Sequence, residues 1–306
     1  LYLLGLALNG FANGIVNVVL QLYLVSLGFD GAAIALIATM NPIGTALLTI
    51  PAGLFTDRYG KGKIILSQQI TLGITLTALL MTSFFYPRSL GMFCFAFFLL
   101  GINNALCVAH GPFYSSFFSR EDMDKAFGLL GFINILSSSI GSLSGFIPPA
   151  LVERYGFSYK DAYQTMMIIA SGVFLPITSL MIIVVKGAPQ AKARTQLGFN
   201  LRSKAFVGKF SLITAVTQIA FASFFNFFPY YANRRFGIQS DSLGALYFTS
   251  NLAQAGTNIM AYRASKRIGT LKTISASIVL STPFYLMIPL SPSFTLVSIA
   301  YILRLS

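Results

Sequence analysis

Long apolar runs dominate this chain and limit the folds that it can adopt. Of its 306 residues, 55% are hydrophobic and 9% are charged, and the mean hydropathy is +0.74. A helix needs roughly 20 apolar residues to cross about 30 Å of hydrocarbon, and soluble domains of this length do not have such a composition. We therefore expect an all-α, polytopic transmembrane bundle with spans near 1–27, 32–56, 64–86, 89–118, 127–152, 161–185, 207–232, 241–262 and 272–290, and a tenth from about 293.

The basic residues between these runs alternate between two sides of the predicted membrane. Fifteen of them, from Arg58 to Lys272, lie in the connections that follow the second, fourth, sixth and eighth runs. The opposite connections contain only Arg88, Arg154, Lys160, Arg234 and Arg235. By the positive-inside rule the first side is cytoplasmic, which predicts a cytoplasmic N-terminus and a multi-pass protein of the plasma membrane.

The formal net charge of +13 does not indicate a nucleic-acid partner, because the basic residues form no face on a soluble domain. The chain has no phosphate-binding loop of the Gly-x-x-x-x-Gly-Lys-Ser/Thr type, so direct use of ATP is not indicated. Cys94 and Cys107 lie about 20 Å apart on one predicted helix and are expected to be free thiols. We expect no metal, no cofactor and no enzymatic activity.

A polar, basic stretch divides the spans into two groups. Residues 187–206 are expected to form a cytoplasmic linker between an N-terminal six-helix bundle, residues 1–186, and a partial C-terminal bundle, residues 207–306. The two groups share a degenerate repeat, because Arg267 and Gly269 follow Arg58 and Gly60 at an offset of 209 residues. Duplicated halves of this kind are typical of secondary transporters.

The connection at residues 53–63 has the pattern Gly-x-x-x-Asp-Arg-x-Gly followed by a basic residue. We expect a tight turn in which Gly60 and Gly62 reverse the backbone and the adjacent charges keep the connection cytoplasmic. Arg58 could pair with the acids at residues 121–124.

This pattern, in its place after the second span, resembles the signature loop of the major facilitator superfamily. The resemblance implies twelve helices in two pseudo-repeated six-helix bundles around a central cavity. A chain of this length that starts at Leu1 would then be a fragment that lacks part of helix 10 and helices 11 and 12. The resemblance also implies a conformational gate, to which we assign Gly53, Asp57, Arg58, Gly60 and Lys61.

Amides recur along the predicted spans and are candidates for lining a substrate cavity. In the first span Asn9, Asn13, Asn17 and Gln21 follow each other every four residues on one helix face. An alternative is that these amides bond neighbouring helices, which Gly10 and Gly14 would allow to approach closely. Further candidates are Asn103, Asn104, Gln218, Asn226, Asn251 and Gln254.

Two ionisable side chains fall within predicted spans. His110, the chain's one histidine, could bind substrate or relay a proton, or it could be a neutral imidazole bonded to a carbonyl or to Tyr114. Arg304 lies about 18 Å into the tenth span and could contact an anionic group of the substrate or snorkel to an interface.

These features favour a secondary active or facilitative transporter that moves a small, neutral polar or amphipathic solute by alternating access. The alternatives are a channel-like pore and a drug/proton antiporter, although Phe146 stands where the proline of the antiporter motif would follow Gly145. The expected partners are the lipid bilayer and a small-molecule substrate, and H⁺ or another coupling ion is a further candidate. We expect a monomer.

Overall fold

The computed structural model describes residues 1–119, 122–187 and 227–305, and in these ranges the chain is helical without strands. The helices are α1 (Tyr2–Ser26), α2 (Gly31–Tyr59), α3 (Lys61–Phe85), α4 (Leu90–Leu106), η1 (Cys107–Ala109), α5 (His110–Ser115), α6 (Met123–Ser142), η2 (Leu143–Phe146), α7 (Ile147–Tyr155), α8 (Tyr159–Gly187), α10 (Phe228–Phe236), α11 (Ser240–Ile268), α12 (Thr270–Leu290) and α13 (Phe294–Leu305). Apart from α10, they coincide with the apolar runs of the sequence, and residues 207–226 of the seventh expected span lie outside the described residues.

Six helical stretches of the described residues are long and apolar enough to cross a membrane. Two of them are composite, since a 3₁₀ segment joins α4 to α5 and another joins α6 to α7. The second interruption follows from Pro148 and Pro149, which lack the N–H groups that would bond the carbonyls of Ser144 and Gly145 in a regular helix. The backbone tightens at η2 immediately before them.

The chain forms two compact units. Unit 1 comprises the described parts of 1–2, 24–124 and 175–230, and unit 2 comprises 3–23, 125–174 and 231–306. Unit 2 thus draws on residues from both predicted halves of the sequence. The division into bundles at residues 186 and 207 stays a prediction, and the linker at 188–206 lies outside the described residues.

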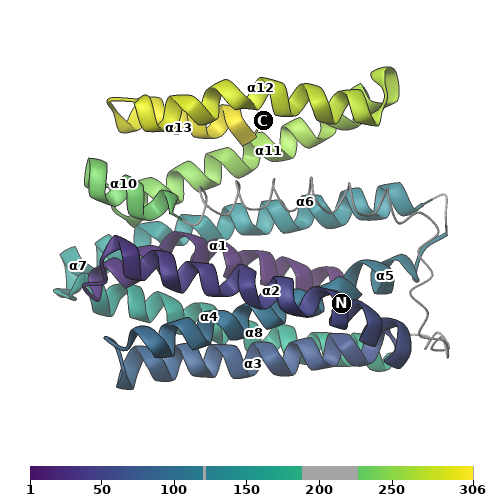
Figure 1. Cartoon of the computed structure of the whole chain (residues 1–306), viewed down its shortest axis with the longest axis horizontal. Helices are drawn as coiled ribbons and strands as arrows, with labels where there is room; N and C mark the ends of the chain where they lie inside the picture. The colour runs from purple at the N-terminus through teal and green to yellow at the C-terminus, as the bar shows by residue number, and fades with distance from the viewer. Residues whose placement is uncertain (120–121, 188–226, 306) are drawn as a thin grey trace. The chain divides into compact units, whose positions relative to one another are not determined.

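Within unit 1, helices α2, α3 and α4 run lengthwise beside one another (Figure 1). Helices α2 and α4 approach most closely at two glycines. A Cβ on Gly44 would lie 2.6 Å from the carbonyl oxygen of Phe98, and Gly101 faces the backbone of Asn41 and Thr45. The Thr45 hydroxyl donates to the Gly101 carbonyl at 3.1 Å, so the contact combines close packing with a hydrogen bond.

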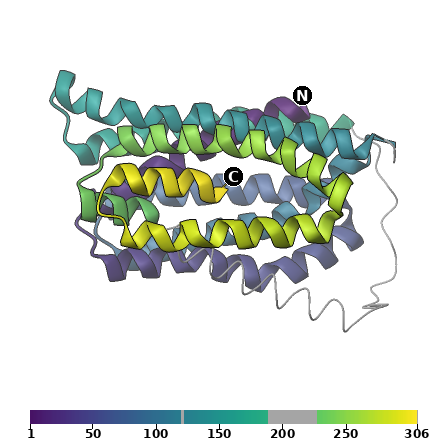
Figure 2. The same cartoon turned by 90° about the horizontal axis from the view of Figure 1, so that it is seen from above.

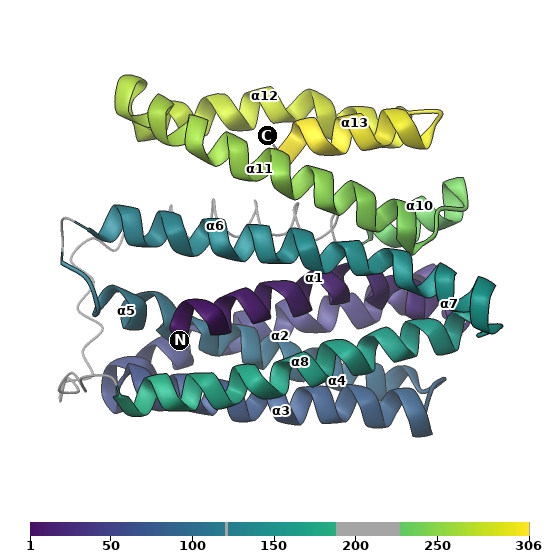
Figure 3. The same ribbon diagram turned by 180° about the vertical axis from the view of Figure 1, so that it is seen from behind.

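Within unit 2, helix α1 packs against α6 (Figure 3), as the glycine spacing predicted. A Cβ on Gly14 would lie 2.9 Å from Cα of Gly141, and one on Gly10 would lie 2.8 Å from the carbonyl oxygen of Asn134. Helix α13 lies between α11 and α12 (Figure 2). Gly145 meets Gly244 of α11, and Ser240 donates to the Gly145 carbonyl at 2.8 Å, which replaces the bond that Pro149 cannot make.

The repeat proposed from the sequence is present in the backbone. Gly60 has φ 91° and ψ 148°, and Gly269, 209 residues later, has φ 90° and ψ 149°. Each is a one-residue turn at the end of a 29-residue helix, α2 or α11. A second pair of positive-φ glycines, Gly28 and Gly237, has the same separation.

The structure corrects the expected shape of the connection at residues 53–63. Helix α2 continues through the signature to Tyr59, and α3 begins at Lys61. Only Gly60 has the positive φ of a turn. Gly62 is helical, and a Cβ there would lie 2.9 Å from Cγ1 of Val185 on α8, so this glycine makes room for a neighbouring helix.

Candidate functional site

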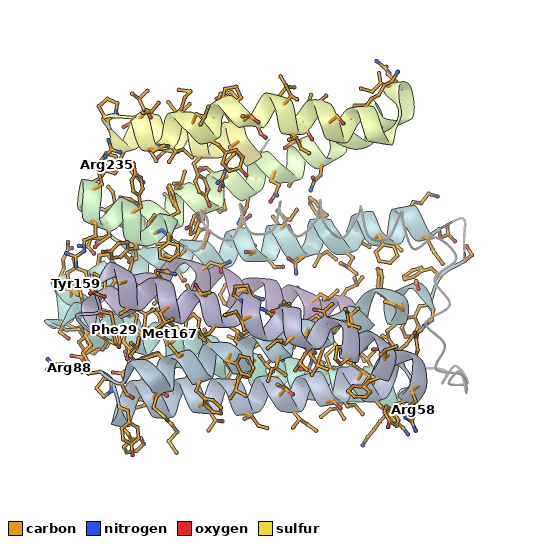
Figure 4. The ribbon with its side chains drawn as sticks, in the orientation of Figure 1. Phe29, Arg58, Arg88, Tyr159, Met167 and Arg235 are labelled. Carbon is orange, nitrogen blue, oxygen red and sulfur yellow. The ribbon has the colours of Figure 1, made fainter. Side chains whose placement is uncertain are left out.

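The labelled side chains of Figure 4 mark both ends of unit 1 and one end of unit 2. In unit 1, Arg58 lies at one end of the helices, and Arg88 lies with Phe29 at the other. In unit 2, Tyr159 and Arg235 lie at a common end. Arg58 and Arg88 were assigned to opposite sides of the membrane from the charge pattern, and they lie at opposite ends of unit 1.

The amides of α1 have unequal environments. Asn13 and Asn17 are exposed, Asn9 is half-buried and Gln21 is buried. The Asn13 amide donates to the Asn9 side-chain oxygen at 2.6 Å, so these two side chains form a pair on one helix face. Since Gly10 and Gly14 pack on α6, the helix combines a packing face with a separate polar face.

His110 belongs to a chain of hydrogen bonds in unit 1. Its Nδ1 lies 3.0 Å from the Tyr2 hydroxyl, and its Nε2 lies 3.1 Å from the Gln68 side-chain oxygen. That oxygen also accepts a bond from the Gln69 amide at 2.8 Å. Because an amide oxygen accepts, Nε2 carries the ring proton, and Nδ1 accepts from Tyr2. The imidazole is therefore bonded at both nitrogens, but to different partners from those expected.

Gln68 and Gln69 extend this network to other helices. The Gln69 oxygen accepts from Thr178 of α8 at 3.4 Å, and Gln68 donates to the Cys107 sulfur at 3.5 Å. Asn103 donates to the Gln68 backbone carbonyl at 2.8 Å and is 4% exposed. This buried amide thus joins α4 to α3.

Neither glutamine was among the residues singled out from the sequence. The available signal was a pair of adjacent amides in the middle of the third apolar run, where polar groups must find partners. Cys94 and Cys107 are free, as expected.

Asn104, unlike its neighbour Asn103, is exposed. Its amide donates to the side-chain oxygen of Asn41 on α2 at 3.1 Å. Asn41 was also not singled out from the sequence, although an asparagine before Pro42 interrupts an otherwise apolar run. The two amides form a polar pair on adjacent helices.

The remaining cavity candidates lie in or near the C-terminal segments. Asn251 and Gln254 of α11 are half-buried. Arg304 of α13 is 4% exposed, and its guanidinium carbon lies 4.1 Å from the ring centre of Tyr301 and 5.0 Å from that of Tyr285. Aromatic faces attract the cation, which explains how a guanidinium is accommodated inside the unit. Gln218 and Asn226 lie outside the described residues.

The proposed gate residues lie at the junction of α2 and α3. Asp57 and Arg58 are exposed on the last turn of α2, where the Arg58 guanidinium lies 5.3 Å from the Tyr59 ring centre. Lys61 donates to the Pro112 carbonyl of α5 at 2.8 Å, so it fastens this junction to the next helix. A Cβ on Gly53 would meet no atom within 4 Å.

Of the acids proposed to pair with Arg58, Asp122 accepts a hydrogen bond from Ser119 at 2.9 Å. Glu121 and the Asp124 side chain lie outside the described part of the chain. The pairing of Arg58 with this acidic cluster stays a prediction.

The helix interiors of the described ranges contain no carboxylate, because every acid there lies near a helix end or in a connection. Asp30, for example, caps α2 by accepting from the Ala33 N–H at 2.8 Å. Among the described side chains, no group of three or more His, Cys, Asp or Glu could hold a metal ion. Among the side chains that the structure describes, the polar groups inside the helices are amides, hydroxyls, thiols, the His110 imidazole and the Arg304 guanidinium.

Solved structures with the same fold are transporters. A bacterial homologue of the human lysosomal transporter Spinster, in an inward-facing and occupied conformation, has a TM-score of 0.67 and 13% identity, and the match covers 99% of this chain and 70% of that one. The nucleoside transporter NupG has a TM-score of 0.65 and 14% identity, covering 99% and 79%. The Escherichia coli fucose:proton symporter FucP has a TM-score of 0.58 and 11% identity, covering 99% and 81%.

At these identities the structural matches show the fold alone. Comparison with curated proteins found no significant sequence match. The sequence model of the Major Facilitator Superfamily matches residues 2–304, nearly the whole chain. The chain is therefore a multi-pass membrane protein that belongs to the Major Facilitator Superfamily of transporters.

Proposed function

We propose that this protein moves a small, neutral polar or amphipathic solute by alternating access, as a secondary active or facilitative transporter of the plasma membrane with a cytoplasmic N-terminus. One observation carries the choice of a neutral solute: the helix interiors of the described ranges offer amides and hydroxyls but no carboxylate. A cationic solute would need such a counter-charge inside the membrane. The one guanidinium, on Arg304, is covered by two aromatic rings.

The amides assigned to substrate binding are Asn9, Asn13 and Asn17 on α1, Asn104 on α4, and Asn251 and Gln254 on α11. Support comes from the exposure of Asn13, Asn17 and Asn104, because an amide that faced hydrocarbon would leave polar groups unpaired. We remove Asn103 from this set, since its side-chain oxygen and its NH₂ group both bond Gln68.

Solute counterflow in liposomes tests the proposal. Uridine and L-fucose are suitable probes, because both are neutral and polar and structural neighbours carry nucleosides or fucose by name. Vesicles loaded with an unlabelled probe should accumulate the labelled form transiently above its equilibrium level. A pore would give equilibration without trans-acceleration, and this result with every accepted solute would refute alternating access.

Proton coupling through His110 is a second candidate, supported by its position in a hydrogen-bonded chain that reaches Tyr2. A proton on Nδ1 would turn this acceptor into a donor and displace the Tyr2 O–H. His110→Ala should then abolish uptake driven by a pH gradient while solute exchange continues. Unchanged dependence of uptake on pH would exclude this role.

The gate at the α2–α3 junction is proposed to set the balance between inward-open and outward-open states. Asp57 is exposed and available to accept hydrogen bonds from a helix N-terminus, whose dipole favours a negative charge. Asp57→Asn should slow transport and shift this balance. If the transport rate and the populations of both states stay at wild-type values, Asp57 is not a gate residue.

A further inference from the structure

The amide pair Asn41–Asn104 lies on the side of its helices opposite to Ile50 and Phe95, two exposed apolar residues. Ile50 follows Asn41 by nine positions and is 63% exposed, and Phe95 precedes Asn104 by nine positions and is 54% exposed. Nine residues at about 100° each amount to about half a turn beyond two full turns. If Ile50 and Phe95 face lipid, both amides point away from lipid.

Close packing fixes the separation of the two amides. Gly44 lies three residues after Asn41, Gly101 lies three residues before Asn104, and a side chain at either glycine would strike the opposite backbone. The Thr45 hydroxyl also bonds the Gly101 carbonyl at 3.1 Å. A pair held by backbone contacts is preorganised, which lowers the cost of binding a ligand.

The bond between the two amides leaves a defined set of groups for a ligand. An amide has one acceptor oxygen and an NH₂ donor. Because Asn104 donates to Asn41, Asn41 retains its NH₂ group and Asn104 retains its oxygen. If Asn41 were the donor instead, Asn41 would retain its oxygen and Asn104 would retain its NH₂ group. One donor and one acceptor would still remain for a ligand.

We propose that Asn41 and Asn104 form a two-point subsite for a solute that carries a lactam edge, a carbonyl next to an N–H in one ring. The Asn41 NH₂ donates to the ligand carbonyl, and the Asn104 oxygen accepts from the ligand N–H. An anion would be repelled by the Asn104 oxygen, and a cation would be repelled by the Asn41 NH₂ group. This inference rests on the proposed function and specifies its substrate class.

Uridine and 3-methyluridine test the subsite, because the methyl group removes the N–H and leaves the carbonyl. In counterflow with the full protein, 3-methyluridine should compete with tritiated uridine about 10- to 100-fold less well than unlabelled uridine does, since the Asn104 oxygen is left unpaired. Asn41→Leu and Asn104→Leu should each raise the KM for uridine. In Asn104→Leu, the concentrations of uridine and 3-methyluridine needed for equal competition should differ by no more than about threefold.

Thr49→Val is the matched control, because the Thr49 hydroxyl is on α2 and bonds only the Thr45 carbonyl of its own helix at 2.6 Å. It should retain the wild-type preference for uridine. Thermal unfolding of each variant in detergent separates a loss of binding from a loss of folding. If Asn104→Leu fails to fold, Asn104→Asp takes its place in the test. Aspartate keeps the size of the side chain and an acceptor oxygen, so this variant should keep the preference for uridine over 3-methyluridine.

Two results would overturn the subsite: equal competition by both nucleosides in the wild type, or a preference that stays the same in Asn104→Leu while affinity for both nucleosides is unchanged or falls equally. An equal fall would assign the amides to helix packing. Counterflow of L-fucose alongside either of these would leave the proposed transport function standing, whereas equilibration of every accepted solute without trans-acceleration would contradict the function as well.

Discussion

Gln68 makes side-chain polar contacts with three residues of neighbouring helical segments: His110, Asn103 and Cys107. Its side-chain oxygen faces His110 and Gln69, and its NH₂ group faces Asn103 and Cys107. The side chain is 4% exposed. In a low-dielectric surrounding such a network is stabilising only while each member keeps its partners.

Gln68→Leu should therefore destabilise the protein by about 1–3 kcal/mol, because it leaves the His110 Nε2–H and the Gln69 NH₂ group without an acceptor. Ser67→Ala is the control, since Ser67 is exposed and bonds only the Lys63 carbonyl of its own helix. In thermal unfolding in detergent, the midpoint temperature should be clearly lower for Gln68→Leu than for the wild type. The midpoint for Ser67→Ala should be almost the same as that of the wild type. Equal midpoints would mean that the network does not stabilise the fold.

The partners of single side chains were the least predictable part of the candidate site. Their place in the fourth apolar run made both Asn103 and Asn104 candidates for the cavity, yet one is buried against Gln68 and the other is exposed beside Asn41. Neighbouring positions on a helix point about 100° apart, so they meet different surroundings. The sequence contains no direct information on which helix lies opposite each face.

Helix contacts depend on where glycine occurs along each element. On α6, Gly141 faces α1, whereas a Cβ on Gly131 would meet no atom within 4 Å. The spacing of Gly10 and Gly14 predicted a close contact, and the structure shows its partner to be α6. Apolar length predicted the spans seen in the described residues, because it is a local property of the sequence, whereas the interruptions at η1 and η2 and the helical conformation of Gly62 were not predicted.

Gly14→Ala should lower stability by about 1–3 kcal/mol, because the new Cβ would lie 2.9 Å from Cα of Gly141 and from the Ser142 nitrogen, and backbone atoms have little room to move. Gly131→Ala should have no cost or stabilise by about 0.5–1 kcal/mol, since alanine restricts the unfolded chain. The unfolding midpoint should fall for Gly14→Ala and stay the same or rise for Gly131→Ala. A similar loss in both would argue against the α1–α6 contact.

At the scale of the whole molecule, the charge pattern predicts which ends of the helices face the cytoplasm. Arg88 and Lys125 are both exposed, in connections assigned to opposite sides. The positive-inside rule depends on the sum of many basic residues, so a few exceptions do not alter the orientation.

Cysteine labelling tests this orientation in a protein whose Cys94 and Cys107 are replaced by serine. Arg88→Cys should react with a membrane-impermeant maleimide in intact cells, and Lys125→Cys should react only after the membrane is permeabilised. The serine-substituted parent should remain unlabelled. The reverse pattern would place the N-terminus outside the cell.

The continuity of α2 through the signature has a mechanical consequence. A helix of 29 residues is about 44 Å long, so part of it extends beyond a hydrocarbon layer of about 30 Å. A force on Asp57 is not absorbed by a flexible loop but is passed along a continuous helix, which contains Pro42 and Pro51. Binding or releasing this end of α2 would tilt the whole helix. The same helix carries Asn41, about 24 Å from Asp57 along its axis.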